Sequence, residues 1–405
     1  MIDLATARAA IIAHVPLAAA SAEQVALGDA LGRVLAGDLV APRDIPGFAH
    51  AAMDGYAVRA VDLQGTAPIR LRLKGVLHAG AGLAPALAAG ECLRIMTGAP
   101  LPPGADTVVI RENTHEADGT VEIAVGTAPG ANVRAADDDF AAGMQALRAG
   151  EIASAAALGV MASFGLSTVA VRRRPRVAVL VTGDELAAPG TALGVGQRHD
   201  SNGTLLPALA AGAGAQVVSV ERVRDDAQVL SEALQAAAAR ADFVLTTGGA
   251  SAGDADYLPV VVARIGERVF WKVAMRPGMP ACFGRVGGVP VFGLPGNPVS
   301  VFATFHALVR PALARWLGAP GLDPAPVVAQ LAQAVDKRHA RLEFRRARLS
   351  ADASGRLQVA IHPSTSSGAL RSVLASNALA EFAAEPRRWE AGERVPVHML
   401  AGALP

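Results

Sequence analysis

Strand-like and helix-like segments alternate regularly from Arg176 to Gly318. Short apolar runs rich in Val alternate with longer segments whose apolar residues recur at helical spacing. Strands joined by helices are parallel, because a parallel pair needs a long crossover, and the helices then cover both faces of the sheet. The alternation therefore predicts a three-layer α/β domain with a mostly parallel sheet in the middle.

The rest of the 405-residue chain must form further domains, because a single core rarely grows beyond about 250–300 residues. Helical patterns cover residues 3–14 and 29–36. Alternating apolar stretches separated by Gly and Pro fill residues 65–125 and return after Val327. We therefore expect one β-rich domain before the α/β domain and another after it.

Two segments look like export or membrane signals, and neither fits. Residues 1–20 lack a basic start and are interrupted by charged residues and a proline, so we expect a surface helix. Residues 152–171 carry no charge, but they are mostly Ala, Ser, Gly and Thr. We expect a buried helix at 154–164 and a strand at 168–171, because membrane spans need consistent apolarity.

Composition narrows the class of partner. The formal net charge is +1, which does not favour nucleic acid. Cys92 and Cys282 are the only cysteines, so we expect no disulfide framework and no zinc site. These features predict a cytoplasmic protein without a nucleic-acid or membrane partner.

The carboxyl ends of the expected strands carry the polar residues. Ligands of an open parallel sheet bind at that edge. Each of four strands runs into a polar or Gly-rich cluster: TGDEL with Asp184 and Glu185, RDD with Asp225 and Asp226, GGASAGDAD with Gly248, Gly249, Ser251, Asp254 and Asp256, and LPGNPVS with Asn297, Pro298 and Ser300. If the strands are parallel, all four clusters share one rim, and the ligand site is expected there.

Each cluster also has a purely structural interpretation. Asp225 with Asp226 and Asn297 with Pro298 stand where helices are expected to begin, and Asp256 could cap the helix that follows it. Glu185 could be a surface carboxylate. The coincidence of all four clusters on one rim favours a site over four separate structural roles.

The loop after the third strand indicates the kind of ligand. Its Gly residues allow a close approach to backbone N–H groups, which suits an anion, yet it lacks the Lys of a nucleotide-binding phosphate loop. Carboxylates beside an anion would repel it, and a divalent cation removes this conflict, because Mg²⁺ takes oxygen ligands and bridges to phosphate. The rim therefore predicts a phosphorylated ligand with Mg²⁺. A dinucleotide fold is not favoured, since no G-x-G-x-x-G follows the first strand.

These motifs, in this order, resemble those of the molybdopterin molybdenumtransferases, the MoeA family, and of the matching domain of gephyrin. The similarity extends to FAHAAMDGYAV, RIMTGAPLPPGADTVV, NVRAADDDFAAG and HPSTSSGALRSVLASNAL, and so covers nearly the whole chain. The resemblance implies four domains: an elongated helical linker domain at 1–44 and 138–171, a small β-rich domain at 45–137, an α/β molybdopterin-binding domain at 172–322 and a C-terminal β-barrel-like domain at 323–405.

The resemblance also implies the reaction. Adenylylated molybdopterin and molybdate would be the substrates, Mg²⁺ the cofactor, and AMP the leaving product. A homodimer is implied, and transient contact with the molybdopterin adenylyltransferase is expected. The alternative is a non-catalytic molybdopterin-binding scaffold of the same fold. A nucleotide pyrophosphate hydrolase is not favoured, because an isolated α/β hydrolase would need neither the Asp54 signature nor the C-terminal β domain.

The family's functional positions fall on particular residues of this chain. Catalytic roles are implied for Asp54, Thr97, Asp139, Glu185, Asp225 and Asp256, of which the last three would hold Mg²⁺. Substrate-binding roles are expected for Gly248, Gly249, Ser251, Lys272, Arg276, Pro295, Asn297, Pro298, Ser300 and Ser372. Of these, the two glycines and Ser251 would seat the phosphate side of the pterin, and the two basic residues would attract molybdate.

One departure from the family pattern concerns the oxyanion. Where the family usually has K-P-G-K-P, this chain has MRPGMP, so that Arg276 keeps one charge and Met279 lacks the other. The sequence therefore predicts weaker molybdate binding than in a chain with both lysines, and a gain in affinity on Met279→Lys.

Overall fold

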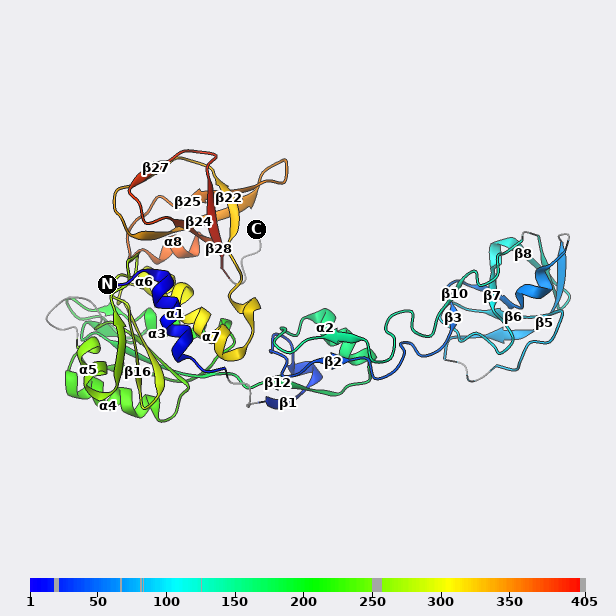
Figure 1. The fold of residues 1–405 in the computed structure, drawn as a ribbon, viewed down its shortest axis with the longest axis horizontal. Helices are drawn as coiled ribbons and strands as arrows, with labels where there is room; N and C mark the ends of the chain where they lie inside the picture. The colour runs from blue at the N-terminus through cyan, green and yellow to red at the C-terminus, as the bar shows by residue number, and fades with distance from the viewer. Residues whose placement is uncertain are drawn as a thin grey trace.

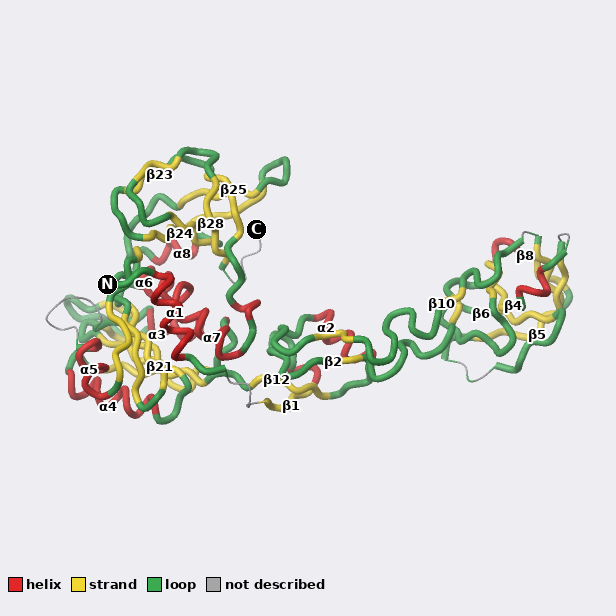
Figure 2. The backbone as a smooth tube through the Cα atoms, in the orientation of Figure 1, coloured by secondary structure: helices red, strands yellow, loops and turns green. Residues whose placement is uncertain are grey.

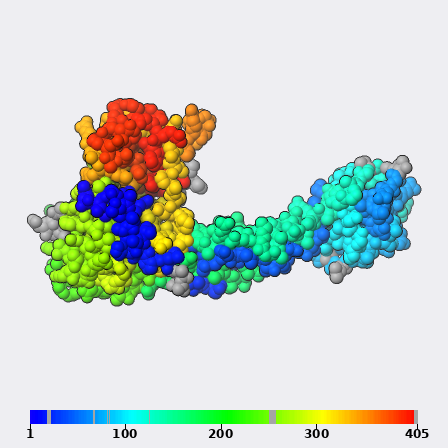
Figure 3. Space-filling model, in the orientation of Figure 1, coloured from blue at the N-terminus to red at the C-terminus, as the bar shows by residue number. Residues whose placement is uncertain are grey.

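The computed structural model describes residues 1–17, 22–65, 68–80, 82, 84–124, 126–249 and 257–400. The chain is elongated (Figure 1). An α/β lobe and a C-terminal barrel lie together at one end, and a linker lobe connects them to a small distal lobe at the other end (Figures 1 and 3). Helices concentrate in the α/β lobe, whereas the linker and distal lobes are mostly strands and loops (Figure 2).

The α/β lobe contains a six-stranded sheet in the order β16-β13-β17-β21-β20-β18. The first four strands are parallel, and the last two extend the sheet in antiparallel fashion. The predicted parallel-rich sheet is therefore confirmed. The strands are β13 (Arg176–Thr182), β16 (Gln216–Val223), β17 (Phe243–Thr247), β18 (Glu267–Trp271), β20 (Cys282–Val286) and β21 (Val289–Leu294).

Helices cover both faces of this sheet because its central strands are apolar on both sides. On β17, Phe243 and Leu245 pack into one core with α1, α3, α6 and α7, whereas Val244 packs into a second core with α4 and α5. The predicted three layers are therefore confirmed. The helices are α1 (Leu4–His14), α3 (Asn202–Gly212), α4 (Ala227–Ala238), α5 (Leu258–Ile265), α6 (Pro298–Thr304) and α7 (Arg310–Leu317), the last two joined by a π-helical segment (Phe305–Val309).

The linker lobe is an extended assembly around one helix. The helix and strand expected within residues 152–171 are confirmed, with Ser154 as the helix N-cap. No helix of the described residues is long and apolar enough to cross a membrane. The elements of the lobe are β1 (Ala22–Ala26), a 3₁₀ turn (Leu27–Asp29), β2 (Leu39–Val40), β11 (Gln145–Leu147), α2 (Ala155–Ser163) and β12 (Thr168–Arg172).

The helix predicted at residues 29–36 is wrong. Only the 3₁₀ turn Leu27–Asp29 touches that range, and it is followed by a turn at residues 31–32 and isolated β-bridges at residues 34–35. The backbone N–H of Leu35 donates to the carbonyl of Glu151 at 2.9 Å, and Val34 forms a β-bridge with Ile152. Pairing with a segment more than a hundred residues away overrides the local helical pattern.

The distal lobe is a half-barrel sheet in the order β7-β4-β6-β5-β9-β8. Strand β3 comes before this sheet in the chain and β10 after it, and the two form a short antiparallel pair. Its core contains Tyr56, Leu71, Cys92 and Val109. The strands are β3 (His50–Ala51), β4 (Gly55–Val58), β5 (Ile69–Leu77), β6 (Glu91–Ile95), β7 (Thr107–Ile110), β8 (Thr114–Ala117), β9 (Thr120–Ile123) and β10 (Val133–Arg134), with 3₁₀ turns at Ala60–Leu63 and Arg111–Asn113.

The C-terminal region has the strand order β24-β25-β22-β28-β26. The first strand, β24, also pairs with the last, β26, so the five strands form a closed barrel. A two-stranded ribbon, β23 with β27, contributes Val335 and Trp389 to the core of the barrel. The predicted β-barrel-like domain is confirmed. The elements are a 3₁₀ turn (Pro320–Leu322), β22 (Val327–Leu331), β23 (Val335–Lys337), β24 (Leu342–Ala351), β25 (Leu357–Ile361), α8 (Leu370–Leu374), β26 (Ala378–Phe382), β27 (Arg387–Trp389) and β28 (Arg394–Met399).

Two short pairings position the functional region. Strand β19 (Met275–Arg276) leaves the α/β lobe and pairs in parallel with the start of β24, which joins the barrel to the α/β lobe. Strands β14 (Leu186–Ala187) and β15 (Arg198–His199) pair beside the carboxyl end of β13.

Candidate functional site

The carboxyl ends of β13, β16, β17 and β21 meet at one edge of the α/β sheet because these strands are parallel neighbours. A cavity of about 460 Å³, which we call the rim pocket, opens there. Residues of all four predicted clusters line it, so the expectation that they share one rim is confirmed. The lining residues are Thr182, Gly183, Glu185, Leu186, Arg198, His199, Asp200, Ser201, Asn202, Asp225, Gly248, Gly249, Gly296, Asn297, Pro298, Gly368 and Leu370.

The turn after β17 approaches the end of β13 so closely that a side chain would not fit. Gly248 and Gly249 have φ angles of 90° and 59°, which favour glycine. A Cβ atom on Gly248 would lie 2.4 Å from the carbonyl oxygen of Thr182. The turn therefore presents bare backbone to the rim pocket. Ser251 and Asp256, which follow in the same loop, lie outside the described residues.

Three carboxylates gather at the ends of β13 and β16. The backbone N–H of Asp184 donates to Oδ2 of Asp225 at 3.2 Å. Burial raises the pKa of Asp225; that hydrogen bond opposes the shift, and the nearby charges of Asp184 and Glu185 add to it. A carboxylate in this position is stabilised in its charged form by a cation. Within the described part of the chain, no group of three His, Cys, Asp or Glu side chains is placed to hold a metal ion.

The two neighbouring acids of the RDD cluster have different roles. Oδ1 of Asp226 accepts hydrogen bonds from the N–H groups of Gln228 at 2.8 Å and Val229 at 2.9 Å, so Asp226 is the N-cap of α4. These bonds lower the pKa of Asp226. Asp225 makes no such cap and lines the rim pocket instead. The structural interpretation of the cluster is therefore correct for Asp226 alone.

The polar run at residues 198–202, which ends on the first residue of α3, was not predicted as part of the site. Asn202 is 6% exposed, and its Nδ2 donates to Oγ1 of Thr247 at 2.9 Å and to the carbonyl of Gly296 at 2.7 Å. Oγ1 of Thr247 in turn donates to the carbonyl of Pro295 at 3.0 Å. Asn202 thus ties the ends of β17 and β21 together. The available signal was a polar run that leads into a helix and follows the TGDEL cluster in the sequence. The lining residues of this run are Arg198, His199, Asp200, Ser201 and Asn202.

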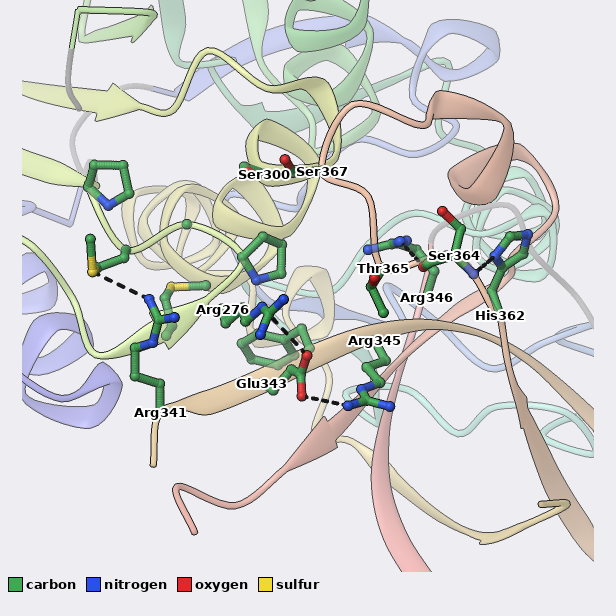
Figure 4. A pocket seen from close by; sticks show the side chains of 16 residues that line it. Arg276, Ser300, Arg341, Glu343, Arg345, Arg346, His362, Ser364, Thr365 and Ser367 are labelled. Atoms are coloured by element: carbon green, nitrogen blue, oxygen red, sulfur yellow. Dashed lines mark hydrogen bonds and ion pairs between the residues drawn. The ribbon is translucent and has the colours of Figure 1, made fainter. Parts of the chain in front are cut away.

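A second cavity, of about 250 Å³, lies between the MRPGMP turn and the barrel (Figure 4). We call it the arginine pocket, because four arginines line it against one carboxylate, Glu343. Arg276 was predicted to bind a ligand, whereas the three arginines of the RLEFRR run were not. The lining residues are Met275, Arg276, Pro277, Gly278, Met279, Pro280, Ser300, Arg341, Glu343, Phe344, Arg345, Arg346, His362, Ser364, Thr365 and Ser367.

Buried hydrogen bonds fix one of these arginines. The side chain of Arg346 is 6% exposed, and its Nε donates to Oγ of Ser372 at 3.0 Å. Its Nη2 donates to the carbonyls of Ser364 and Ser366. Ser372 is fully buried and lines neither pocket, so it orients Arg346 rather than facing a ligand.

The two pockets share a wall. The start of α6 contributes Asn297 and Pro298 to the rim pocket and Ser300 to the arginine pocket. Between them, the N–H of Val299 donates to the carbonyl of Ser367 at 3.1 Å. Along the chain, residues 364–367 contribute to the lining of the arginine pocket, and Gly368 and Leu370, which follow Ser367, line the rim pocket. Ligands in the two pockets would therefore be neighbours.

Lys272 does not join Arg276 in the arginine pocket. Its φ angle is 73°, and its Nζ lies 4.2 Å from the centre of the Trp271 ring. Its backbone N–H donates to the carbonyl of Ala281 at 2.9 Å, which places it at the open end of the hairpin whose turn is MRPGMP. Lys272 lines neither pocket.

Asp54 and Thr97 lie together, but in the distal lobe. Oδ1 of Asp54 accepts from the N–H of Thr97 at 2.8 Å and from its Oγ1 at 2.7 Å. These two bonds lower the pKa of Asp54. Asp139 is exposed, and its N–H donates to the carbonyl of Ile45 near the base of that lobe. The distal lobe is at the opposite end of the chain from both pockets (Figures 1 and 3), so one chain does not bring these residues together.

The fold and the paired pockets define a multidomain α/β protein with a strand-end binding site closed on one side by a β-barrel. Family models match the chain in three consecutive parts. They are described as the MoeA N-terminal region (domain I and II), at residues 2–165, a probable molybdopterin binding domain, at 178–315, and the MoeA C-terminal region (domain IV), at 328–400.

Individual relatives agree with these models. Molybdopterin molybdenumtransferase 2 of Mycobacterium tuberculosis is 40% identical over 332 residues, which cover 80% of this chain and 82% of that protein. Molybdopterin molybdenumtransferase of Haemophilus influenzae is 33% identical over 399 residues, which cover 98% of each. A crystal structure of a molybdopterin biosynthesis MoeA protein from Pyrococcus horikoshii matches with a TM-score of 0.86 and 28% identity, covering 99% of this chain and 100% of that one.

The chain belongs to the MoeA family of molybdopterin molybdenumtransferases. The predicted family and fold class are confirmed, and so are the enzyme class, a transferase, and the role in molybdenum cofactor biosynthesis. The roles of individual site residues stay predictions.

Proposed function

We propose that this chain inserts molybdate into adenylylated molybdopterin with release of AMP, in a reaction that depends on Mg²⁺. The observation that carries the proposal is the shared wall of the two pockets, formed where Val299 bonds Ser367. One pocket offers backbone and carboxylates, as a phosphorylated ligand with Mg²⁺ requires, and the other offers arginines, as an oxyanion requires. Two substrates that react with each other need such adjacent sites.

The rim pocket would hold the phosphate side of the pterin. Gly248 and Gly249 line it with bare backbone, and Asn297 and Pro298, after the neighbouring strand β21, line it beside them. Mg²⁺ usually takes one or two carboxylates from the protein and completes its shell with water and substrate phosphate. Glu185 and Asp225 fit that donor set, and Asp256 is a further candidate from the adjoining loop. The ion would neutralise phosphate charge and stabilise the departing AMP.

The arginine pocket would hold molybdate. Its four arginines exceed its single carboxylate by three charges, which suits a dianion. Arg276 is predicted to contact the oxyanion, since its side chain is 43% exposed and lies 3.9 Å from Glu343. Ser300 lines the same cavity and is a further hydrogen-bond donor. Lys272 would act only at longer range, as a charge that attracts the anion.

The distal lobe would act in a second copy of the chain. Asp54 and Thr97 already form one hydrogen-bonded unit, yet they lie far from the pockets of their own chain (Figure 1). A two-fold homodimer in which each distal lobe leans over the partner's rim pocket resolves this separation. Asp139, near the base of the lobe, would then lie beside the interface. We also propose a cytoplasmic location and transient contact with the adenylyltransferase that supplies the pterin.

The proposal predicts AMP release that requires molybdate and Mg²⁺ together. Purified protein mixed with adenylylated molybdopterin should release AMP only when both are present, and EDTA should stop the release. Product AMP is measured by chromatography, and heat-treated protein is the control. Tight binding of the pterin without molybdate-dependent AMP would instead support the non-catalytic scaffold.

A further inference from the structure

We infer that a third cavity, of about 540 Å³, binds a small molecule that has one carboxylate and an apolar body. We call it the joint pocket, because it lies where the α/β lobe meets the linker lobe (Figure 1). It shares no lining residue with the rim pocket or the arginine pocket. The inference therefore goes beyond the proposed function and does not depend on it.

Both passages of the chain between these two lobes border the joint pocket. Leu17 follows α1, before the chain enters the linker lobe at β1, and Arg172 ends β12, before the chain returns to the α/β lobe at β13. The two side chains meet at Gly318, the C-cap of α7. A Cβ atom on Gly318 would lie 2.9 Å from Cδ1 of Leu17 and 3.2 Å from Cζ of Arg172. The pocket therefore has walls from both lobes.

The guanidinium of Arg172 has donors free for an acidic ligand. Its Nε and Nη1 are buried, and neither has a hydrogen-bond partner among the described residues. The next residue shows the usual situation, since Arg173 donates two hydrogen bonds to Asp242 at 2.7 and 3.2 Å. A buried charged donor without an acceptor is unfavourable, and such groups normally bind an anion or water. Because Arg172 lines the joint pocket, a ligand there reaches this guanidinium.

The other charged residues leave the joint pocket positive. Arg8 donates from Nε to the carbonyl of Ala307 at 2.8 Å, and its Nη2 lies 3.9 Å from Oδ2 of Asp323, the one carboxylate of the lining. Arg315, in the last turn of α7, has no ion pair or side-chain hydrogen bond within the described part of the chain. Arg172 and Arg315 are thus two unpaired cations of one cavity. A guanidinium binds a carboxylate through two parallel hydrogen bonds, which makes a carboxylate the fitting anion.

Apolar side chains line much of the rest of the joint pocket. Ile12 of α1 and Leu17 contribute from one segment, and Pro311 and Ala314 contribute from α7. Leu17 is 42% exposed, so a ligand that covers it removes apolar surface from water. Small-molecule sites of this volume combine apolar walls with a few polar groups that fix the orientation of the ligand. A carboxylate with an apolar body satisfies both parts of the lining, whereas an anion without such a body satisfies one.

The test uses octanoate as the probe, with acetate and 1-octanol as probes that each lack one half of the ligand. Dissociation constants are measured by calorimetry at low salt, where charge contacts are least screened. Octanoate should bind the wild-type chain at least about tenfold more tightly than either control probe. Arg172→Gln should weaken octanoate binding about tenfold, the equivalent of about 1.4 kcal/mol, and leave octanol binding unchanged. Arg315→Gln, at an exposed position, should also weaken octanoate binding. Arg174→Gln, likewise exposed, is the matched control and should change neither value.

Several results would overturn the inference. Octanoate that binds no more tightly than acetate and octanol would mean that the joint pocket does not take such a ligand. An equal loss in Arg174→Gln would indicate unspecific attraction to surface charge. If Arg172→Gln lowers the melting temperature and leaves octanoate binding unchanged, Arg172 only stabilises the C-terminal end of α7. If it changes the oligomeric state in sedimentation instead, a second copy of the chain covers the pocket. Should Arg172→Gln fail to fold, Arg315→Gln decides, and unchanged octanoate binding in that variant would contradict the site.

Discussion

Asp225→Asn is expected to lower molybdate-dependent AMP release by at least about a hundredfold, because the loss of even an outer-shell partner of a metal site costs about 10–100-fold. Asp225 lines the rim pocket and does not cap α4, because the N-cap of that helix is Asp226. Burial and two acidic neighbours raise the pKa of its carboxyl. The charged form is therefore unfavourable there, and a bound cation would stabilise it. The amide keeps the shape and removes the charge.

The adjacent acid provides the matched control. Asp226→Asn keeps an N-cap residue on α4, so it should change AMP release less than about threefold and stability by only a few tenths of a kcal/mol. Raised Mg²⁺ should restore part of the activity of Asp225→Asn and none of any loss in Asp226→Asn. Equal losses in the two variants, or early melting of Asp225→Asn, would show that position 225 is structural. For Asp256→Asn we predict a loss of molybdate-dependent AMP release as large as that of Asp225→Asn.

Mixing two inactive variants is expected to restore activity. Asp54→Ala removes the acceptor that holds Thr97 in the distal lobe, and Asp225→Ala removes the rim carboxylate. If each site combines the rim of one chain with the distal lobe of its partner, a mixed dimer has one intact site and one site with both defects. Random exchange makes half of the dimers mixed, so the mixture should recover about a quarter of wild-type activity.

The controls for this experiment are each variant alone and a mixture of Asp225→Ala with Glu185→Ala. Both defects of the second mixture lie in one lobe, so mixed dimers should stay inactive. Subunit exchange is followed with chains carrying two different tags. No recovery in the first mixture, despite proven exchange, would mean that the distal lobe does not complete the partner's site.

The α/β lobe was predictable because its pattern is local and repeated. Strand β17 is buried at every position, and its neighbours alternate with helices, so the parallel order and the common rim follow from general rules. The predicted clusters therefore met where expected. Even so, sequence could not separate Asp225 from Asp226, since both stand before the helix and only the hydrogen bonds distinguish them.

The arginine pocket was not predictable from local pattern. Arg276 and Arg341 are brought together by the pairing of β19 with β24, which joins two lobes. Nothing in the RLEFRR run indicates which turn it will face. The helix wrongly expected at 29–36 has the same cause, because the pairing of Leu35 with Glu151 is also distant in sequence. Long-range strand pairing determines both the arginine pocket and the conformation of residues 29–36. Apolar alternation and helical spacing are local patterns, so they do not predict such pairing.

A crystal structure of the protein soaked with AMP, Mg²⁺ and molybdate would show whether two substrates bind in adjacent pockets. Anomalous scattering at the molybdenum edge locates the oxyanion independently of the other density. We expect a molybdenum peak among Arg276, Arg341 and Ser300, with the AMP phosphate on the far side of the Val299–Ser367 wall, near Gly248. A molybdenum peak outside the arginine pocket, with AMP bound away from the rim, would contradict it.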